Sequence, residues 1–280
     1  MPNSIKVSLP MHDEVFDFPE FAQNATDVWD EMADWWDDKI GDGNSSQDEL
    51  IEPTTERLLQ PGPGQLILDI ACGAGRMARR IADTGAEVVA FDQTSRFIER
   101  AQTRSQDCGD RIEYLRGKAD DAEFLKTLGK DRFDATVCTM AIMDMAVVTP
   151  LATALPGMLK PGAKFVFSVT HPVFNSSGRR IVVEEEEQAN EVVSRTSVQV
   201  FDYVVPHPFE GIGIVGQPVP HQYFHRPVSL LINLFTEQGF VLDRLEEPVF
   251  NGARANNKLT SGAYREFPAF LFFGMHLERV

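Results

Sequence analysis

The segment LDIACGAGRMARR (68–80) joins an apolar run to a charged, helical pattern through a glycine-cornered turn. The run QLILDIA (65–71) has the length of a buried strand. Gly73 and Gly75 permit backbone conformations that side chains would obstruct, and they let a ligand approach the main chain closely. A strand, a glycine-rich turn and a helix in this order predict a nucleotide site. The glycines alone fit several kinds of nucleotide.

Outside this segment, strand patterns and helix patterns alternate along the chain. Predicted strands cover 65–71, 87–92, 111–117, 133–140, 163–170, 240–247 and 267–279, and predicted helices cover 75–83, 95–105, 121–128, 148–158 and 226–238. Several strands are uninterrupted apolar runs, which is typical of strands that are buried on both faces. We therefore predict an α/β fold with a parallel sheet that helices cover on both sides.

Two segments fall outside this alternation. Residues 1–60 are predicted to form an N-terminal tail and a helical lid, because apolar side chains, including all three tryptophans, recur at helical spacing between residues 21 and 36. Residues 61–280 are predicted to form the main domain. Within it, residues 172–224 are too long for an ordinary connection and are predicted to form a β-rich cap.

The composition argues against several kinds of partner. The 42 acidic and 26 basic side chains give a formal charge of −16, which repels phosphate backbones, and no basic patch offsets it. No apolar run is long enough to span a bilayer and no secretory signal is evident, so we expect no membrane partner and a cytoplasmic location. The three cysteines show no metal-binding spacing, and no metal site is predicted. Nothing in the sequence indicates the oligomeric state.

The residues around the glycines separate the competing nucleotide classes. A P-loop is excluded because no Gly-Lys-Ser/Thr follows the turn, whereas a dinucleotide site stays possible because its fingerprint accepts Ala78. Asp69 is costly inside an apolar strand end unless it has a hydrogen-bonding task. It would repel a pyrophosphate but could organise an amino group. Asp92, 19 residues after Gly73, ends the next strand, where a carboxylate can accept hydrogen bonds from a ribose diol.

Several segments in combination resemble a known enzyme family. They are D-x-A-C-G-x-G (69–75), AFD (90–92), FDATVCTMAIMD (133–144) and LKPGAKFVFSVTHP (159–172). Together they resemble the class I S-adenosylmethionine-dependent methyltransferases over about residues 60–280. The resemblance implies a Rossmann-like seven-stranded sheet, mostly parallel with an antiparallel last strand. It also implies S-adenosyl-L-methionine as the cofactor and S-adenosyl-L-homocysteine as its product.

The resemblance assigns cofactor contacts to particular residues. It places the amino-acid end of the cofactor at the glycine turn, the ribose hydroxyls at Asp92 and the adenine beside Gln93. In GKADD (117–121), Lys118 stands where the family often has an acid near the adenine, so Ala119 and Asp120 are expected to supply other contacts there. The full set of expected cofactor residues is Asp69, Ala71, Gly73, Gly75, Asp92, Gln93, Ala119, Asp120, Met140 and Trp36.

The chain lacks motifs that are typical of nucleic-acid methyltransferases. No [DN]PP[YF] follows the predicted strand 133–140, and no Pro-Cys pair occurs. SVTHPVF (168–174), HRPVSLLINLFTEQGF (225–240) and FPAFLF (267–272) resemble a small-molecule subgroup with a His-Pro after the fifth strand. We therefore expect methyl transfer to a hydroxyl or amine of a small-molecule acceptor, with no nucleic-acid partner. A protein methyltransferase and an inactive S-adenosylmethionine-binding protein remain alternatives.

Methyl transfer from a sulfonium is an in-line displacement, in which the protein positions the reactants and excludes water. A base is needed only if the acceptor loses a proton. His171, directly after the fifth predicted strand, is the candidate base, and its alternative role is to cap that strand end. The candidate acceptor contacts, for which packing is the alternative role, are Trp29, Phe174, Tyr223 and His225, and His207 and His221 in the cap rank below them. Trp36 is placed at the sulfonium through cation–π attraction.

Overall fold

The computed structural model describes residues 16–278 apart from residues 42, 190 and 251–263. The first fifteen residues of the predicted tail and the last residue of the strand predicted at 267–279 therefore lie outside the described residues. The α-helices are α1 (Ala22–Ile40), α2 (Glu52–Leu59), α3 (Arg76–Asp83), α4 (Ser95–Arg104), α5 (Ala122–Thr127), α6 (Thr149–Met158) and α7 (Val228–Thr236). The shorter helical segments are η1 (Pro19–Phe21), η2 (Gln47–Ile51), η3 (Gln106–Arg111) and η4 (Ile142–Asp144).

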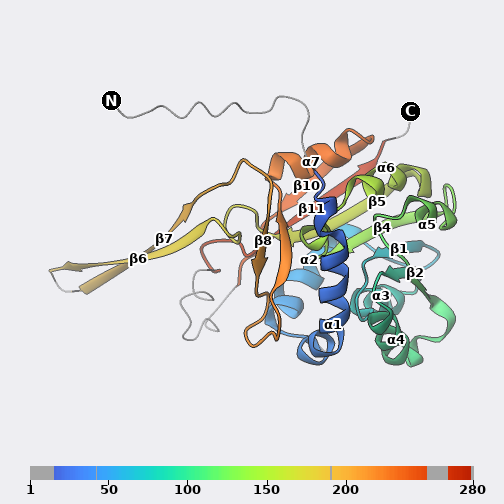
Figure 1. Ribbon diagram of the computed structural model, residues 1–280, viewed down its shortest axis with the longest axis horizontal. Helices are drawn as coiled ribbons and strands as arrows, with labels where there is room; N and C mark the ends of the chain where they lie inside the picture. Colours follow the sequence, from blue (N-terminus) through green and yellow to red (C-terminus); the bar gives the residue numbers. More distant parts are fainter. Residues whose placement is uncertain (1–15, 42, 190, 251–263, 279–280) are drawn as a thin grey trace.

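Seven strands form the central sheet of the molecule (Figure 1). They are β1 (Leu66–Ile70), β2 (Glu87–Asp92), β3 (Ile112–Arg116), β4 (Phe133–Thr139), β5 (Leu159–Thr170), β10 (Phe240–Glu246) and β11 (Phe270–Leu277). The strand order is β10-β11-β5-β4-β1-β2-β3, with β1 to β5 paired in parallel and β11 antiparallel to both neighbours. The predicted α/β fold with an antiparallel last strand is confirmed.

Successive side chains of each strand point to opposite faces of the sheet, so the core is divided into two layers, one on each face. One set of strand residues packs with α2 and α3, and the alternate set packs with α5, α6 and α7. The first set includes Ile67, Val88, Ala90, Val137 and Val166, and the second includes Leu68, Val89, Phe91, Phe165 and Phe167. Strands that are apolar on both sides therefore produced the uninterrupted runs in the sequence, and this burial fixes the strand register.

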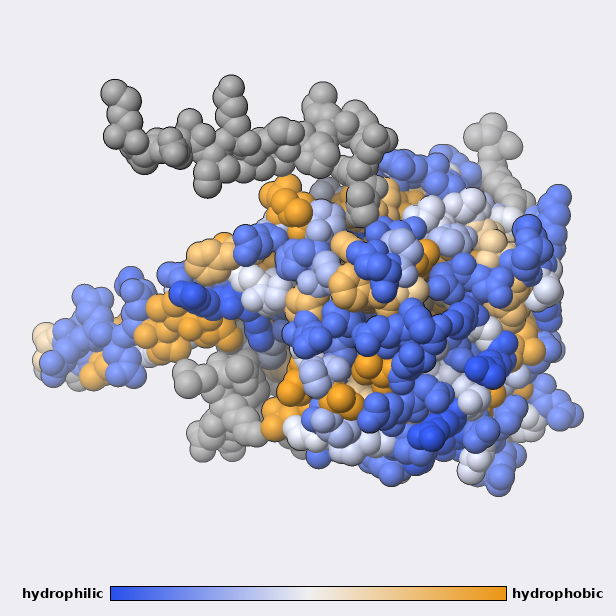
Figure 2. Space-filling model, viewed as in Figure 1, coloured by the Kyte–Doolittle hydropathy of each residue, from blue (hydrophilic) through white to orange (hydrophobic). Residues whose placement is uncertain are grey.

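Two hairpins occupy the predicted cap. The first pairs β6 (Arg179–Gln188) with β7 (Glu191–Val200) and projects from the body as an arm (Figure 1). Apolar and charged side chains both lie on its surface, and Val183 and Val192 are exposed (Figure 2). The second pairs β8 (His207–Gly211) with β9 (His221–His225) and packs against α1 and η4. The cap therefore contains an outer arm and an inner hairpin, while the division of the chain into residues 1–60 and 61–280 stays an interpretation.

A buried arginine connects the N-terminal segment to the loop after β4. Arg226 is 2% exposed and donates hydrogen bonds to the carbonyl oxygens of Phe16 (2.8 Å), Ile142 (3.2 Å), Met145 (2.9 Å) and Ala146 (3.3 Å). Burial lowers the pKa of its guanidinium to about 10, so the group stays charged at neutral pH. This side chain fixes the loop after β4 beside the residues that precede η1.

No helix in the described part of the chain has both the length and the apolar character that crossing a membrane requires.

Candidate active site

A cavity of about 870 Å³ lies at the carboxyl ends of the parallel strands. Its walls come from the turns after β1 to β4, from α1 and from the β8–β9 hairpin. Open parallel sheets bind their ligands at this edge. The lining includes the predicted site residues Trp29, Trp36, Asp69, Ala71, Gly73, Asp92, Gln93, Ala119, Asp120, Met140 and Tyr223.

The two glycines of the opening turn have different tasks. Gly73 has a φ of +53°, and a Cβ built on it meets nothing within 4 Å, so its backbone faces open space in the cavity. Gly75 has a φ of +73° and precedes α3, where a Cβ would lie 2.2 Å from the Tyr114 hydroxyl. The cavity lining does not include Gly75. Gly75 therefore has a packing role against Tyr114, and its cofactor contact stays a prediction.

Asp92, at the end of β2, fixes the glycine turn from the neighbouring strand. Its carboxylate accepts hydrogen bonds from the backbone N–H groups of Gly73 (3.0 Å) and Thr94 (2.9 Å). Burial raises the pKa of Asp92, and these hydrogen bonds oppose that rise. Each carboxylate oxygen has more than one acceptor direction, so the group can hold the turn and still accept from a ligand.

Asp69 lies in β1 beneath the same turn and is 1% exposed. Burial, with a smaller contribution from the charge of Asp92, raises its pKa to about 8. Its Oδ2 atom has no hydrogen-bond partner. Asp69 is thus protonated at neutral pH unless a cation binds nearby, because a nearby positive charge favours the ionised carboxylate.

Unsatisfied polar atoms concentrate around the cavity. Among the described residues, five buried side-chain oxygen atoms have no hydrogen-bond partner, and only the one on Thr55 belongs to a residue outside the lining. The other four are Asp69 Oδ2, Thr94 Oγ1, Thr139 Oγ1 and Asp144 Oδ1. Buried polar groups normally have partners, so this concentration points to a polar ligand. The left-handed backbone of Ala71 (φ 54°) and Met140 (φ 54°), both in the lining, is a further sign of a functional site.

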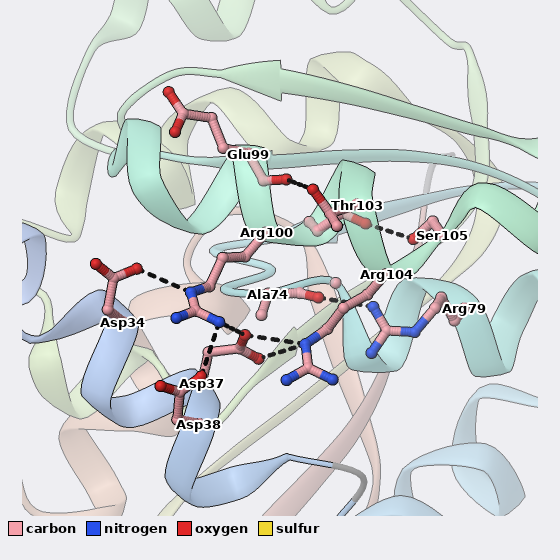
Figure 3. A network of polar contacts seen from close by, with 12 residues as sticks. Asp34, Asp37, Asp38, Ala74, Arg79, Glu99, Arg100, Thr103, Arg104 and Ser105 are labelled. Carbon is pink, nitrogen blue, oxygen red and sulfur yellow. Dashed lines mark hydrogen bonds and ion pairs between the residues drawn. The ribbon is translucent and has the colours of Figure 1, made fainter.

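Helix α1 forms one wall of the cavity, and ion pairs hold it against α4. Arg100 on α4 contacts Asp34, Asp37 and Asp38 on α1, each at 2.8 Å (Figure 3). Arg104 contacts Asp37 at 2.8 Å, and the Asp37 side chain is only 3% exposed. These ion pairs therefore join the predicted helical lid to α4 beside the cavity, whose lining includes Asp37.

The strand-end residues after β2 and β3 form the part of the wall that the resemblance assigns to adenine. Gln93 Oε1 accepts a hydrogen bond from the Thr26 hydroxyl of α1 at 3.0 Å. Lys118, which replaces the expected acid, donates to the same hydroxyl at 3.4 Å. Ala119 and Asp120 line the cavity beside them. The lysine therefore connects the lid to the sheet edge, and Asp120 is the carboxylate left at this position.

The inner hairpin of the cap brings polar and aromatic groups to the opposite end of the cavity. His221 is 2% exposed, and its Nε2 atom lies 3.5 Å from Asp144 Oδ1. The rings of Trp29, Trp36 and Tyr223 lie 4.8, 5.9 and 4.3 Å from the His221 ring. Trp29 and Trp36 are two helical turns apart, so both face the cap. Trp36 therefore lies beside Trp29 and His221 in the cavity lining, and its contact with the cofactor stays a prediction.

His171 does not line the cavity. It is 2% exposed, its Nε2 lies 2.8 Å from Glu247, and its Nδ1 accepts hydrogen bonds from the N–H groups of Val173 and Phe174. Burial lowers the pKa of His171, and Glu247 opposes that shift. Both ring nitrogens are engaged at the strand end, so the geometry matches the capping alternative and provides no path to an acceptor.

Two other predicted acceptor contacts are also absent from the lining. Phe174 packs against His171 (4.7 Å between ring centroids) and Phe267 (5.6 Å). His225 is 5% exposed and its Nε2 lies 2.7 Å from the Tyr203 carbonyl oxygen. Burial lowers the pKa of His225, and the bond to Tyr203 opposes that shift.

Two cavity-lining residues, Asp144 and His221, were not among the leading candidates from the sequence. Asp144 ends the segment CTMAIMD (138–144), which was used only to exclude a nucleic-acid motif. The sequence did contain a signal for Asp144, because this acid follows the end of β4 by five residues, at the edge of the sheet where ligands bind. His221 carried no such signal, since its place depends on the fold of the cap.

Comparisons with known proteins agree with this geometry. Residues 67–162 match a family described as a methyltransferase domain. A ubiquinone biosynthesis O-methyltransferase of Xanthomonas axonopodis pathovar citri is 28% identical over 153 residues, which cover 53% of this chain and 61% of that protein. The chain thus spans about three fifths of the length of this curated relative.

Solved structures show the same fold. An S-adenosylmethionine-dependent methyltransferase from Mesorhizobium loti superposes with a TM-score of 0.62 at 24% identity, covering 80% of this chain and 96% of that one. The glycopeptide N-methyltransferase MtfA, solved with S-adenosyl-L-methionine, has a TM-score of 0.51 at 18% identity, with coverages of 83% and 96%. Residues 67–162 therefore match a methyltransferase domain, within a chain that has the fold of S-adenosylmethionine-dependent methyltransferases of known structure.

Proposed function

We propose that the protein transfers the methyl group of S-adenosyl-L-methionine to a hydroxyl or amine of a small molecule. The observation that carries the proposal is the cavity at the strand ends, where Asp69, Thr94, Thr139 and Asp144 each keep a buried oxygen atom without a partner. The cofactor supplies an electrophilic methyl group on a sulfonium. The residues of this chain bind the two reactants, orient them and exclude water.

The cofactor end of the cavity fits this donor. Asp69 supplies a buried carboxyl group with a free oxygen for an ammonium group, and Gly73 leaves an open surface on the turn. Asp92 supplies a carboxylate for a ribose diol while it holds Gly73. A pyrophosphate at this turn would lie beside Asp69, which favours S-adenosylmethionine over a dinucleotide, whereas Asp92 fits the ribose diol of either ligand.

The other end of the cavity favours a small acceptor. The walls there come from η4, β8 and β9, and His221, Tyr223 and Asp144 line them. This part of the cavity offers room for an acceptor molecule. It therefore supports an active methyltransferase over a protein that binds S-adenosylmethionine but no longer catalyses transfer. Its position beneath the inner hairpin supports a small molecule over a protein side chain. That the His171-Pro172 pair marks a small-molecule subgroup stays a prediction, as do the absence of a nucleic-acid partner and the cytoplasmic location.

The proposal is tested in two steps with the full chain. Calorimetric titration first measures binding of S-adenosyl-L-methionine, for which we expect one site per chain. Mass spectrometry then measures S-adenosyl-L-homocysteine formed with a panel of phenols and amines of matched carbon skeleton. Formation that depends on an added acceptor supports the proposal. Binding without formation across the panel favours the inactive alternative, and absence of binding contradicts the proposal.

A further inference from the structure

We propose, on the basis of the methyl-transfer function above, that the acceptor is a small-molecule amine that binds as an ammonium ion to Asp144. The side chain of Asp144 lines the cavity and is 12% exposed. It follows β4 through η4, whose loop Arg226 fixes by hydrogen bonds to the carbonyl oxygens of Ile142 and Met145. The Asp144 carboxylate thus lies in the part of the cavity beside the inner hairpin, on the η4 turn that Arg226 holds.

The hydrogen bonds of His221 make the carboxylate, and not the imidazole, the group that can receive a proton. Gly213 N–H donates to Gln217 Oε1 at 3.1 Å, which directs the amide nitrogen of Gln217 toward His221 Nδ1 at 2.9 Å. Because Nδ1 accepts from Gln217, the neutral ring carries its proton on Nε2. Nε2 faces Asp144 Oδ1 at 3.5 Å. His221 therefore has no free electron pair for an acceptor, and at 3.5 Å it leaves Asp144 Oδ1 without a hydrogen-bond partner.

The surroundings of Asp144 favour a cation. The rings of Trp29, Trp36 and Tyr223 gather around His221 at this end, and aromatic faces attract cations. The charge of Asp144 and burial both raise the pKa of the Tyr223 phenol, burial being the larger cause, so Tyr223 stays neutral. Arg179 also lines the cavity, but its guanidinium bonds to the Phe174 carbonyl oxygen at 2.9 Å. No arginine or lysine among the described residues forms an ion pair with Asp144.

With an ammonium acceptor, Asp144 can take the proton that the nitrogen must lose before methyl transfer. The ammonium nitrogen gives one proton to the Asp144 carboxylate and gains a free electron pair. That pair forms a bond to the methyl carbon as the carbon–sulfur bond breaks, and the electrons of that bond stay on sulfur. The products are a methylated ammonium ion and a neutral thioether, and the proton on Asp144 leaves to solvent. A hydroxyl acceptor would gain no ion pair with Asp144 and would form its oxyanion beside that carboxyl group.

The test measures ligand binding to the full chain loaded with S-adenosyl-L-homocysteine. Phenethylamine is compared with 2-phenylethanol, and benzylamine with benzyl alcohol, by calorimetry at neutral pH. We expect each amine to bind at least about tenfold more tightly than its alcohol, the size of effect that a charge-assisted hydrogen bond supplies. Asp144→Asn keeps the side-chain shape and should remove this preference. Glu210→Gln removes an exposed carboxylate from the same lining and should keep it.

The outcomes separate this inference from the proposed function. A parent protein that binds S-adenosyl-L-homocysteine but shows no preference for either amine overturns the amine inference and leaves methyl transfer in place. A preference that persists in Asp144→Asn overturns the role of Asp144. Failure of the parent to bind S-adenosyl-L-methionine or S-adenosyl-L-homocysteine overturns the proposed function itself. Unchanged affinity of Asp144→Asn for S-adenosyl-L-homocysteine shows that the variant is folded.

Discussion

The two ends of the cavity are built from different kinds of structure. At the cofactor end, the groups that face the cavity sit on strand ends and are held by neighbouring strands, as Asp92 holds Gly73. At the acceptor end, the groups come from α1, η4 and the inner hairpin of the cap. The first end depends on the register of a buried parallel sheet. The second depends on how two flanking segments meet above it.

The shared fold can specify the donor site, whereas the acceptor site depends on segments that are particular to this chain. The match to a methyltransferase domain covers residues 67–162 and stops before the cap. The inner hairpin, with His221 and Tyr223, lies beyond the matched residues. The donor site should therefore respond to changes in the strand-end turns, and acceptor choice should respond to changes in η4 and the cap.

The largest effect is expected at Asp92. Asp92→Ala removes the predicted ribose contacts and frees the Gly73 turn, and it should weaken S-adenosyl-L-methionine binding about 100-fold, since two charge-assisted hydrogen bonds are lost. Calorimetry measures the change in the dissociation constant. Asp107→Ala, an exposed acid on η3, is the matched control and should bind like the parent. Equal affinity of Asp92→Ala and the parent would remove Asp92 from the site.

The second effect separates the two glycines of one turn. Gly75→Ala should lower the free energy of unfolding by about 2–5 kcal/mol, because the left-handed backbone costs about 1–2 kcal/mol and the clash with Tyr114 adds about 1–3 kcal/mol. Gly73→Ala meets no neighbouring atom, so it should lose cofactor affinity with a smaller loss of stability. Denaturant unfolding measures stability, and calorimetry measures affinity.

A double variant sharpens this contrast. Gly75→Ala with Tyr114→Phe removes the hydroxyl that a Cβ at residue 75 would approach most closely, so part of the lost stability should return. If Gly73→Ala proves the less stable of the two single variants, the assignment of packing to Gly75 and ligand contact to Gly73 is reversed.

The fold was predictable because its strands are buried on both faces. Runs such as LILDI in β1 and FDATVCT in β4 carry that burial directly, and the glycine turn with Asp69 and Asp92 places the donor site. The acceptor end was predicted poorly for a physical reason. His171 lies at a strand end, but Glu247 and two backbone N–H groups occupy its ring, which no local pattern reveals. Asp144 and His221 meet only through the cap, 77 residues apart in sequence.

The third effect tests how the lid is held. Asp37→Asn weakens the contacts of α1 with Arg100 and Arg104, and it should raise the dissociation rate of S-adenosyl-L-methionine about threefold, because partly exposed ion pairs contribute about 0.2–1 kcal/mol each. Stopped-flow displacement measures the rate at low and high salt. Added salt should raise the rate of the parent more than that of the variant. An equal response to salt in both would exclude the ion pairs as the hold on α1.

The smallest effect is expected in the outer arm. Replacing residues 182–197 with Asn-Gly joins Ile181 to its partner Val198 through a two-residue turn. Cofactor affinity should stay within about twofold and the melting temperature within about 2 °C, because an isolated two-stranded hairpin contributes little stability. Thermal unfolding and calorimetry check both values. A large loss of cofactor affinity would show that the arm belongs to the site.

If the cavity at the strand ends holds S-adenosyl-L-methionine, this donor should bind in preference to NAD, and a calorimetric competition between the two ligands measures that preference. We predict saturable binding of S-adenosyl-L-methionine at one site per chain, displaced by S-adenosyl-L-homocysteine and unaffected by NAD. Binding of NAD with no binding of S-adenosyl-L-methionine would contradict this assignment, because a pyrophosphate would then lie beside the unpartnered oxygen of Asp69.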